Sequence, residues 1–208
     1  MSAPPKTLVG IVDDDQSVRK GLARLVKAAG YRVEVFASAR EFLARSQQEE
    51  PCCLLLDLRM PGLTGLELQE ALATAGRQMS IVFISGHGDV VASVRAMKGG
   101  AIDFLTKPVD ARELLGAIER AVAKASTAQR EHVRAMDLQG RLETLTVREA
   151  QVFALVVTGM LNKQIAAELG IVEKTVKVHR ARVMEKMRAG SLAELVRLAD
   201  RAGIIAKP

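Results

Sequence analysis

The sequence has few cysteines and no long apolar run, and both absences narrow what the protein can be. Two of its 208 residues are cysteine, at the adjacent positions Cys52 and Cys53. Neighbours on a strand point to opposite faces and no third cysteine exists, so we expect reduced thiols and neither a disulfide nor a zinc site. No apolar run approaches the roughly 20 residues that a membrane span needs. The segment 1–6 lacks the apolar core of a signal peptide, so we expect a cytoplasmic protein without a membrane partner.

Charge is distributed unevenly along the chain. Hydrophobic residues make up 49% and charged residues 26%, which suits a globular protein of one large or two ordinary domains. Residues 1–124 carry 16 basic and 15 acidic side chains, whereas residues 125–208 carry 14 and 9. Within the second part, 159–188 carry 7 and 3. This excess favours a polyanionic partner near the C-terminus, although a solvated face would give the same pattern.

Short β-rich runs alternate with amphipathic helical stretches in the first part of the chain. The expected strands are 7–12, 32–36, 52–57, 80–85 and 102–106. The expected helices are 16–29, 39–47, 65–75, 89–98 and 111–125. Five strands that alternate with five helices predict an α/β domain with a parallel sheet and helices on both of its faces.

The second part has no strand pattern. No proline occurs from 111 to 142, and the frequent Ala, Arg, Glu and Gln favour a helical linker that is broken near Gly140. A flexible coil is the alternative. Four short helices then follow, at 146–157, 162–169, 173–187 and 191–202. We therefore predict a first domain at 7–124, a linker at 125–141 and an all-α domain at 142–204.

Five polar residues stand where the expected strands end. They are Asp13, Asp14, Asp57, Ser85 and Lys107. The carboxyl ends of parallel strands meet at one edge of a sheet, which is where open α/β sheets bind their ligands. Each residue taken singly has an ordinary explanation as a turn, a helix cap or an exposed side chain. Their conjunction favours a functional site.

The residue types at this edge indicate a metal ion and phosphoryl transfer. Mg²⁺ takes oxygen ligands and needs only one or two carboxylates, so Asp13 and Asp14 would hold it beside Asp57. The main chain near Arg59 could supply a further oxygen. A carboxylate can act as a nucleophile and form an acyl phosphate. The Lys107 ammonium and the Ser85 hydroxyl would contact other phosphoryl oxygens.

These residues resemble the receiver domain of two-component response regulators. The matching stretches are 12–15 (VDDD), 57–62 (DLRMPG), 84–89 (ISGHGD) and 104–108 (FLTKP). The resemblance implies a flavodoxin-like (βα)5 fold with strand order 2-1-3-4-5, and phosphorylation of Asp57 by a sensor histidine kinase. It also implies a switch in which Ser85 moves toward the phosphate and Phe104 turns inward, with Lys107 taking part. An aromatic residue on a strand could equally be a fixed core residue.

The segment 162–187 has the pattern of a helix, a glycine-containing turn and a second helix. In the second helix Val176, Val183 and Met187 share one face. The opposite face carries small, apolar and cationic groups, which fits the major groove of DNA better than a merely solvated helix. The candidate DNA-contacting residues are Lys163, Lys174, Thr175, Lys177, Val178, His179, Ala181 and Arg182.

The segment 142–204 also resembles the LuxR-type helix-turn-helix domain. The matches are 145–149 (LTVRE), Gly159, 162–166 (NKQIA) and 175–180 (TVKVHR). The chain as a whole thus resembles a FixJ/NarL-type transcriptional regulator, and the residues 87–89 favour the FixJ side. The resemblance implies double-stranded DNA as a partner, a homodimer on activation and a last helix that serves dimer contacts.

One residue departs from the family pattern. The family places Ser or a similar cap before the recognition helix, and here Val172 stands there. Valine cannot accept hydrogen bonds from the free amides of a helix start, so the substitution Val172→Ser should stabilise the domain.

Two other functions use the same residues. An Mg²⁺-dependent enzyme could pass through an aspartyl phosphate, but a hydrolase would be expected to carry a general acid or base near Asp57, where Arg59 and Met60 stand. A phosphorylation-controlled module whose basic tail binds protein is the other alternative. We therefore predict a regulator that is not an enzyme.

Overall fold

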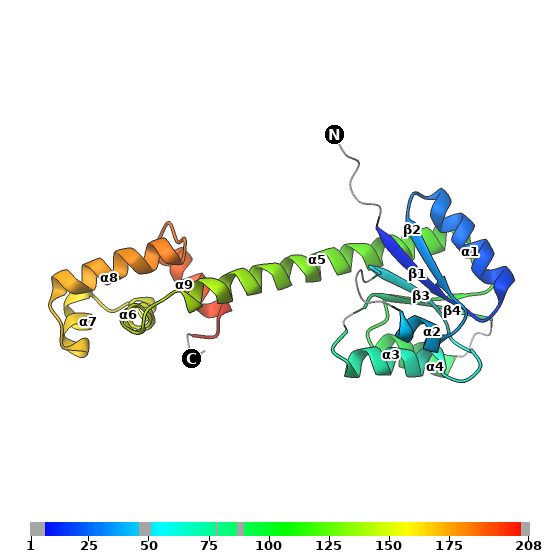
Figure 1. The fold of residues 1–208 in the computed structure, drawn as a ribbon, viewed down its shortest axis with the longest axis horizontal. Helices are drawn as coiled ribbons and strands as arrows, with labels where there is room; N and C mark the ends of the chain where they lie inside the picture. Colours follow the sequence, from blue (N-terminus) through cyan, green and yellow to red (C-terminus); the bar gives the residue numbers. More distant parts are fainter. Residues whose placement is uncertain (1–6, 46–50, 78, 87–89, 205–208) are drawn as a thin grey trace. The chain divides into compact units, whose positions relative to one another are not determined.

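The computed structural model describes residues 7–45, 51–77, 79–86 and 90–204. The chain divides into two compact units, Met1–Ala128 and Gln129–Pro208 (Figure 1). The division falls within the predicted linker, and the domain limits given above stay predictions. None of the helices in the described ranges is both long and apolar enough to cross a bilayer.

The first unit, the receiver unit, is a five-stranded parallel sheet with helices on both faces (Figure 1). The strands are β1 (Leu8–Val12), β2 (Arg32–Phe36), β3 (Cys53–Asp57), β4 (Ile81–Ser85) and β5 (Asp103–Thr106). The helices are α1 (Gln16–Ala28), α2 (Ala39–Ala44), α3 (Gly65–Thr74), α4 (Val90–Lys98) and α5 (Ala111–Glu143). The strand order is β2-β1-β3-β4-β5, which confirms the flavodoxin-like expectation. Helix α2 ends before the predicted residue 47 because Arg45 is already extended.

Two apolar cores lie on opposite faces of this sheet. Leu54 and Leu56 of β3 belong to one core, and Leu55 belongs to the other. All three are completely buried. Burying a leucine side chain contributes about 1.5–3 kcal/mol, so a slip of one residue along β3 would be very costly. Burial thus fixes the register, and the register fixes which side chains follow the strand ends.

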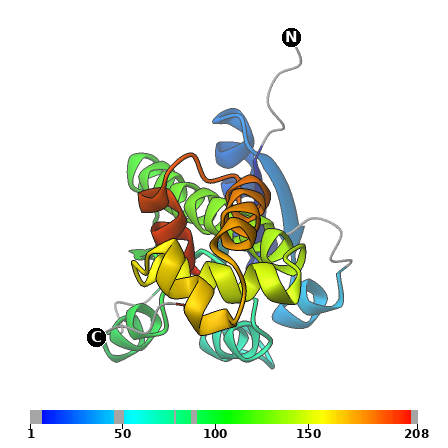
Figure 2. The same cartoon turned by 90° about the vertical axis from the view of Figure 1, so that its left-hand side faces the viewer.

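In its described residues, the second unit contains four helices besides the end of α5 (Figure 2). They are α6 (Val147–Val157), α7 (Asn162–Leu169), α8 (Glu173–Lys186) and α9 (Leu192–Arg201). Their apolar sides enclose a separate core. Residues that are completely or almost completely buried in it are Val152, Phe153, Ile165, Val176, Val183, Met187 and Leu195. The all-α prediction for this part is confirmed.

The predicted break near Gly140 is wrong. Helix α5 continues through Gly140 to Glu143 without interruption, so the linker is helical and not a coil. Glycine in a helix interior costs about 1 kcal/mol relative to alanine. Leu138 and Leu142, on either side of it, pack into the core of the second unit and offset that cost.

Candidate functional sites

The strand register brings the predicted polar residues together at the carboxyl edge of the sheet. Asp57 is the last residue of β3 and lies beside Ile84, while Ser85 ends β4 beside Thr106. Asp13 directly follows β1, and Lys107 directly follows β5. Carboxylate oxygens of Asp13, Asp14 and Asp57 all lie within 4.8 Å of one another. The predicted carboxylate cluster is therefore present in the fold.

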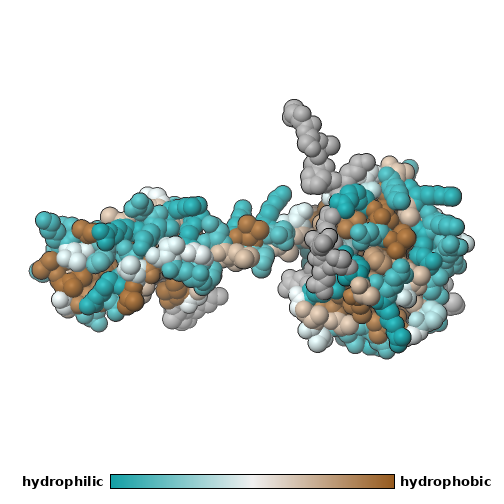
Figure 3. Space-filling view, in the orientation of Figure 1, coloured by the Kyte–Doolittle hydropathy of each residue, from teal (hydrophilic) through white to brown (hydrophobic). Residues whose placement is uncertain are grey.

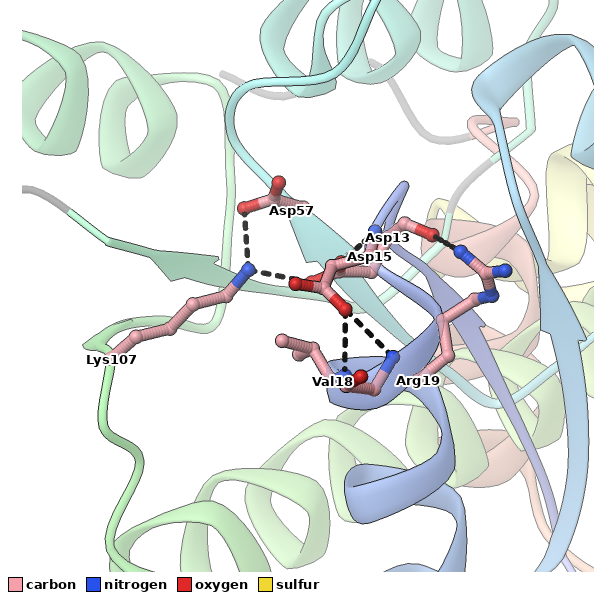
Figure 4. Close-up of polar contacts among 7 residues, drawn as sticks. Asp13, Asp15, Val18, Arg19, Asp57 and Lys107 are labelled. Atoms are coloured by element: carbon pink, nitrogen blue, oxygen red, sulfur yellow. Dashed lines mark hydrogen bonds and ion pairs between the residues drawn. The ribbon is translucent and has the colours of Figure 1, made fainter.

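Lys107 bridges two of these carboxylates (Figure 4). Its Nζ lies 2.7 Å from Asp13 Oδ2 and 3.3 Å from Asp57 Oδ1. The main-chain N–H of Lys107 donates to the carbonyl of Ser85 at 2.7 Å, which ties the residue after β5 to the end of β4. Both Asp13 and Asp57 are buried, and Lys107 is half-buried. The ammonium thus supplies part of the positive charge that the crowded carboxylates require.

The three consecutive aspartates after β1 occupy different places. Asp13 points into the cluster, and its Oδ1 accepts from the Asp15 N–H at 2.8 Å. Asp14 is exposed but still within reach of the other two carboxylates. Asp15 caps α1 by accepting from the N–H groups of Ser17 (2.7 Å) and Val18 (3.3 Å), so it is a structural residue. These hydrogen bonds hold the pKa of Asp15 below its usual value.

Burial and charge act in opposite directions on the other ionisable groups. Burial raises the pKa of Asp57, the Lys107 ammonium opposes that rise, and the neighbouring Asp13 adds to it. Burial lowers the pKa of Lys107, but its hydrogen bonds and charge interactions with Asp13 and Asp57 outweigh this and leave the pKa raised. Ionised Asp57 would therefore gain from another cation. Three carboxylates within 4.8 Å form a hard oxygen donor set of the kind that Mg²⁺ prefers.

Gly65 is a residue of this site that sequence reasoning missed. A Cβ at this position would overlap the main-chain carbonyl oxygen of Asp57 and lie 3.1 Å from the Phe83 ring. The Gly65 N–H also donates to the Leu58 carbonyl at 3.1 Å, so the loop after β3 folds back against the strand end. A glycine at the first position of α3, just after the Thr64 cap, was the available sequence signal.

The other predicted receiver residues differ in their exposure. Phe104 on β5 is half-buried, and its ring stacks on Phe83 with centroids 6.3 Å apart. Ser85 is buried at the edge of the cluster. Arg59 lies exposed in the loop two residues after Asp57. The residues 87–89, which favoured the FixJ side of the family, lie outside the described residues.

In the second unit, α7 and α8 form a helix-turn-helix. Gly170 ends α7 at φ 64°, a left-handed conformation that glycine adopts without strain. Val176 and Val183 of α8 are buried, as is Met187 directly after it, which confirms the predicted core face. The exposed candidates for DNA contacts are Lys163, Lys174, Lys177, Val178, Ala181 and Arg182. Thr175 and His179 are half-buried, and His179 Nδ1 has no hydrogen-bond partner among the described residues.

An ion pair that we did not predict from the sequence holds α8 against the start of α6. Lys186 Nζ lies 2.6 Å from Glu149 Oε2 and donates to the Thr144 carbonyl at 2.8 Å. The same Glu149 oxygen accepts from the Thr146 N–H at 2.9 Å, and the side chain is only 2% exposed. The hydrogen bond from Lys186, followed by that from Thr146, lowers the pKa of Glu149 to about 2. The spacing Thr146-x-x-Glu149 was the available signal, because it is a capping box.

Two further contacts orient α8. Arg180 donates to Asn162 Oδ1 of α7 at 3.2 Å. Arg141, near the end of α5, donates to the Met187 carbonyl at 3.0 Å and pairs with Asp137. The exposed face of α8 is therefore held in place by contacts from three other helices.

Comparison with known proteins identifies both units. Residues 9–119 match the family described as response regulator receiver domain, and 143–199 match the bacterial regulatory proteins of the luxR family. The chain is a response regulator of the FixJ/NarL type. Nodulation protein W of Bradyrhizobium diazoefficiens is 46% identical to it over 98% of this chain and 90% of that protein. The transcriptional regulatory protein FixJ of Rhizobium meliloti is 44% identical over 94% and 96%.

Solved structures agree with this response regulator assignment. The response regulator StyR has a TM-score of 0.85 at 47% identity, covering 94% of this chain and 99% of that one. Full-length FixJ from B. japonicum has a TM-score of 0.60 at 40% identity, covering 98% and 100%. The protein is thus a transcription regulator with a receiver domain and a LuxR-type DNA-binding domain.

Proposed function

We propose that this response regulator is switched by phosphorylation of Asp57. The contacts of Lys107 with both Asp13 and Asp57 carry this proposal, because an ammonium and two further carboxylates lie around the Asp57 carboxylate. A sensor histidine kinase supplies the phosphoryl group. A carboxylate oxygen of Asp57 attacks phosphorus, the P–N bond of the phosphohistidine breaks, and the imidazole leaves with the electron pair.

Mg²⁺ fits the oxygen donors of the site. Asp13, Asp14, Asp57 and the main-chain carbonyl of Arg59 would hold it. When bound, it neutralises part of the negative charge that accumulates between the phosphoryl group and the carboxylates. Lys107 contributes an ammonium from the other side and is already oriented by its two ion pairs.

We assign Ser85, Phe104 and Lys107 to the step that follows phosphorylation. A phosphoryl group adds negative charge and strong acceptor oxygens beside Asp57. Ser85 lies at the end of the neighbouring strand, and its carbonyl is hydrogen-bonded to the Lys107 main chain. Movement of these two residues changes the packing of Phe104 on Phe83 and favours a homodimer.

The dimer would place two copies of α8 on neighbouring half-sites of bacterial chromosomal DNA, which puts the protein in the cytoplasm. Lys174, Val178 and Ala181 face the bases, and Lys177 and Arg182 flank them. Lys163, Thr175 and His179 contact the backbone around them. The exposure of the basic groups and the firm attachment of α8 to its neighbours support this assignment.

The deciding experiment combines a small-molecule phosphodonor, Mg²⁺ and a pool of random-sequence DNA duplexes. Intact mass should show one added phosphoryl group, light scattering should show a dimer, and the phosphorylated protein should enrich a two-fold symmetric sequence. The variant Asp57→Asn should show none of the three, because an amide is not a nucleophile toward phosphorus. Glu131→Gln, which also replaces a carboxylate by an amide but lies at an exposed position of α5 outside both proposed sites, is the control and should behave as the unaltered protein.

Two results would contradict the proposal. Continuous turnover of the phosphodonor without accumulation of phosphoprotein would favour the enzyme alternative. Phosphorylation of an aspartate in the Asp57→Asn variant would show that the acceptor has been assigned to the wrong residue.

A further inference from the structure

A cationic groove runs between α1 and β2 at the outer edge of the receiver unit. Its volume is about 380 Å³, and it is lined by Arg19, Lys20, Arg24 and Lys27 of α1 and by Val33 and Val35 of β2. A second hollow of about 540 Å³ shares Lys27 and Val33 and continues toward Tyr31, with Arg32 and the acidic Glu34 also in its lining. In Figure 3, apolar surface (brown) lies between hydrophilic surface (teal) over the region where Figure 1 draws α1 and β2.

Three of the four cations of this groove have no carboxylate partner among the described residues. Helix α1 contains four basic residues and no acidic one. Within the described part of the chain, Lys20, Arg24 and Lys27 form no ion pair with a carboxylate. Arg19 donates to the Asp13 carbonyl at 2.5 Å and interacts electrostatically with the Asp15 carboxylate. A row of cations along a groove with an apolar floor attracts an anionic partner.

The main chain of β2 adds a second means of binding. Strand β2 lies at the end of the sheet order and pairs only with β1 in the described chain. The Arg32 N–H donates to Thr7 and the Phe36 carbonyl accepts from Asp13, so the backbone groups of these two residues face β1. Because strand residues alternate, the N–H and C=O groups of Val33 and Val35 face the outer edge. The Val35 side chain is 46% exposed.

We infer that this edge binds an extended acidic segment of a partner protein, which adds as a strand beside β2. The backbone of the segment pairs with Val33 and Val35. Alternate side chains of an added strand face α1, so carboxylates at every second position meet Lys20, Arg24 and Lys27. A DNA duplex offers phosphates but no strand to pair with β2 and no group for the apolar floor, so a peptide fits both features. This inference does not depend on phosphorylation of the protein.

Fluorescence anisotropy with labelled short peptides tests the inference on the full chain. A peptide of alternating Glu and Thr should bind, and its affinity should fall as salt is raised. The same peptide with an N-methyl group on every amide should lose binding, because it has no N–H left to pair with either edge of a strand. A peptide of alternating Lys and Thr should not bind.

Charge-reversal variants locate the site. Lys20→Glu combined with Lys27→Glu should weaken binding of the acidic peptide about tenfold or more, because two attractions become repulsions. Lys98→Glu combined with Lys124→Glu makes the same change of charge at exposed positions elsewhere in the unit and should leave the affinity within about twofold. Val35→Pro removes one outward N–H and should weaken binding without a change of charge.

Three outcomes would overturn the inference. One is equal weakening by both double variants, which would indicate non-specific attraction. A second is undiminished binding of the N-methylated peptide, which would exclude strand addition. The third is tighter binding of a random-sequence DNA duplex than of the peptide, lost in the Lys20/Lys27 variant, which would assign the groove to nucleic acid.

Discussion

The receiver unit carries its proposed chemistry on buried side chains at strand ends, whereas the second unit carries its proposed DNA contacts on exposed side chains of one helix. Asp13 and Asp57 are almost inaccessible and depend on Lys107, which lies far from both in the sequence. Lys174 and Lys177 are exposed, and their places are set by the buried face of the same helix. In the receiver unit, the proposed function therefore depends on a few side chains. In the second unit, it depends on many contacts that are each weak.

This comparison predicts that single substitutions around the receiver cluster have large effects on stability and on phosphorylation. Gly65→Ala forces a methyl group onto the Asp57 carbonyl. We expect a loss of about 1–3 kcal/mol in the free energy of unfolding of the receiver unit, together with slower phosphorylation. Denaturant melts and intact mass after treatment with a phosphodonor measure the two effects.

Gly140→Ala is the control for that prediction. It adds the same methyl group inside α5, where no atom lies near the new Cβ. It should stabilise the protein by up to about 1 kcal/mol. Equal behaviour of the two variants would contradict the proposed close approach of Gly65 to Asp57.

The ion pair of the second unit gives the next largest effect and tests whether buried polar groups matter there too. Glu149→Gln leaves Lys186 without a carboxylate and should cost about 1–3 kcal/mol in the unfolding of that unit. Because the pKa of Glu149 is about 2 when folded and near 4.5 when unfolded, the stability from this group is present above pH 4.5. It is lost as the pH falls from 4.5 toward 2.

The pH dependence of the free energy of unfolding distinguishes the loss of the Glu149–Lys186 ion pair from a general loss of packing in the variant. Unfolding followed between pH 7 and pH 2.5 should therefore show a smaller decrease for Glu149→Gln than for the unaltered protein. Parallel curves for the two proteins would indicate that the carboxylate is not stabilised by Lys186.

Single DNA contacts should have smaller effects. Lys177 is exposed and paired with Glu173 at 3.3 Å, a contact that contributes little in water. Lys177→Ala should weaken DNA binding severalfold and reduce the dependence of the logarithm of the affinity on that of the salt concentration by about one unit. Anisotropy titrations at several salt concentrations measure both. Arg130→Ala, at an exposed position of α5, should leave the salt dependence unchanged, and an equal change in both variants would place the DNA contact elsewhere.

The smallest effect concerns the start of α8. Val172 precedes Glu173 with extended dihedral angles and makes no side-chain cap, as its residue type requires. Val172→Ser should raise the free energy of unfolding by about 1 kcal/mol, measured in a thermal melt. Val147→Ser, at an exposed position inside the first turn of α6, is the control and should not be stabilising, since Thr146 already caps that helix. No gain from Val172→Ser would contradict the helix start at Glu173.

The sequence predicted the strands, nearly all helices and the polar set at the strand ends, because alternating apolar runs and 3.6-residue periodicity are local patterns. It failed at Gly140, where the packing of Leu138 and Leu142 keeps α5 helical despite a poor helix former. It also missed Gly65 and Lys186. Their importance depends on atoms that are distant in the sequence, the Asp57 carbonyl and the Glu149 carboxylate.

The amino-acid sequence by itself determined which groups follow the strands and which face of α8 is polar, since burial of Leu54 to Leu56 and of Val176 and Val183 leaves one register for each element. Only the tertiary structure decided which of those groups lie close enough to form ion pairs and hydrogen bonds with one another. It placed the Lys107 ammonium between Asp13 and Asp57 and assigned Asp15 to a helix cap. It also placed the cations of α1 beside β2, which among the described residues pairs with β1 alone. The physical reason is that electrostatic interactions depend on distance in space, and chain neighbours do not set that distance.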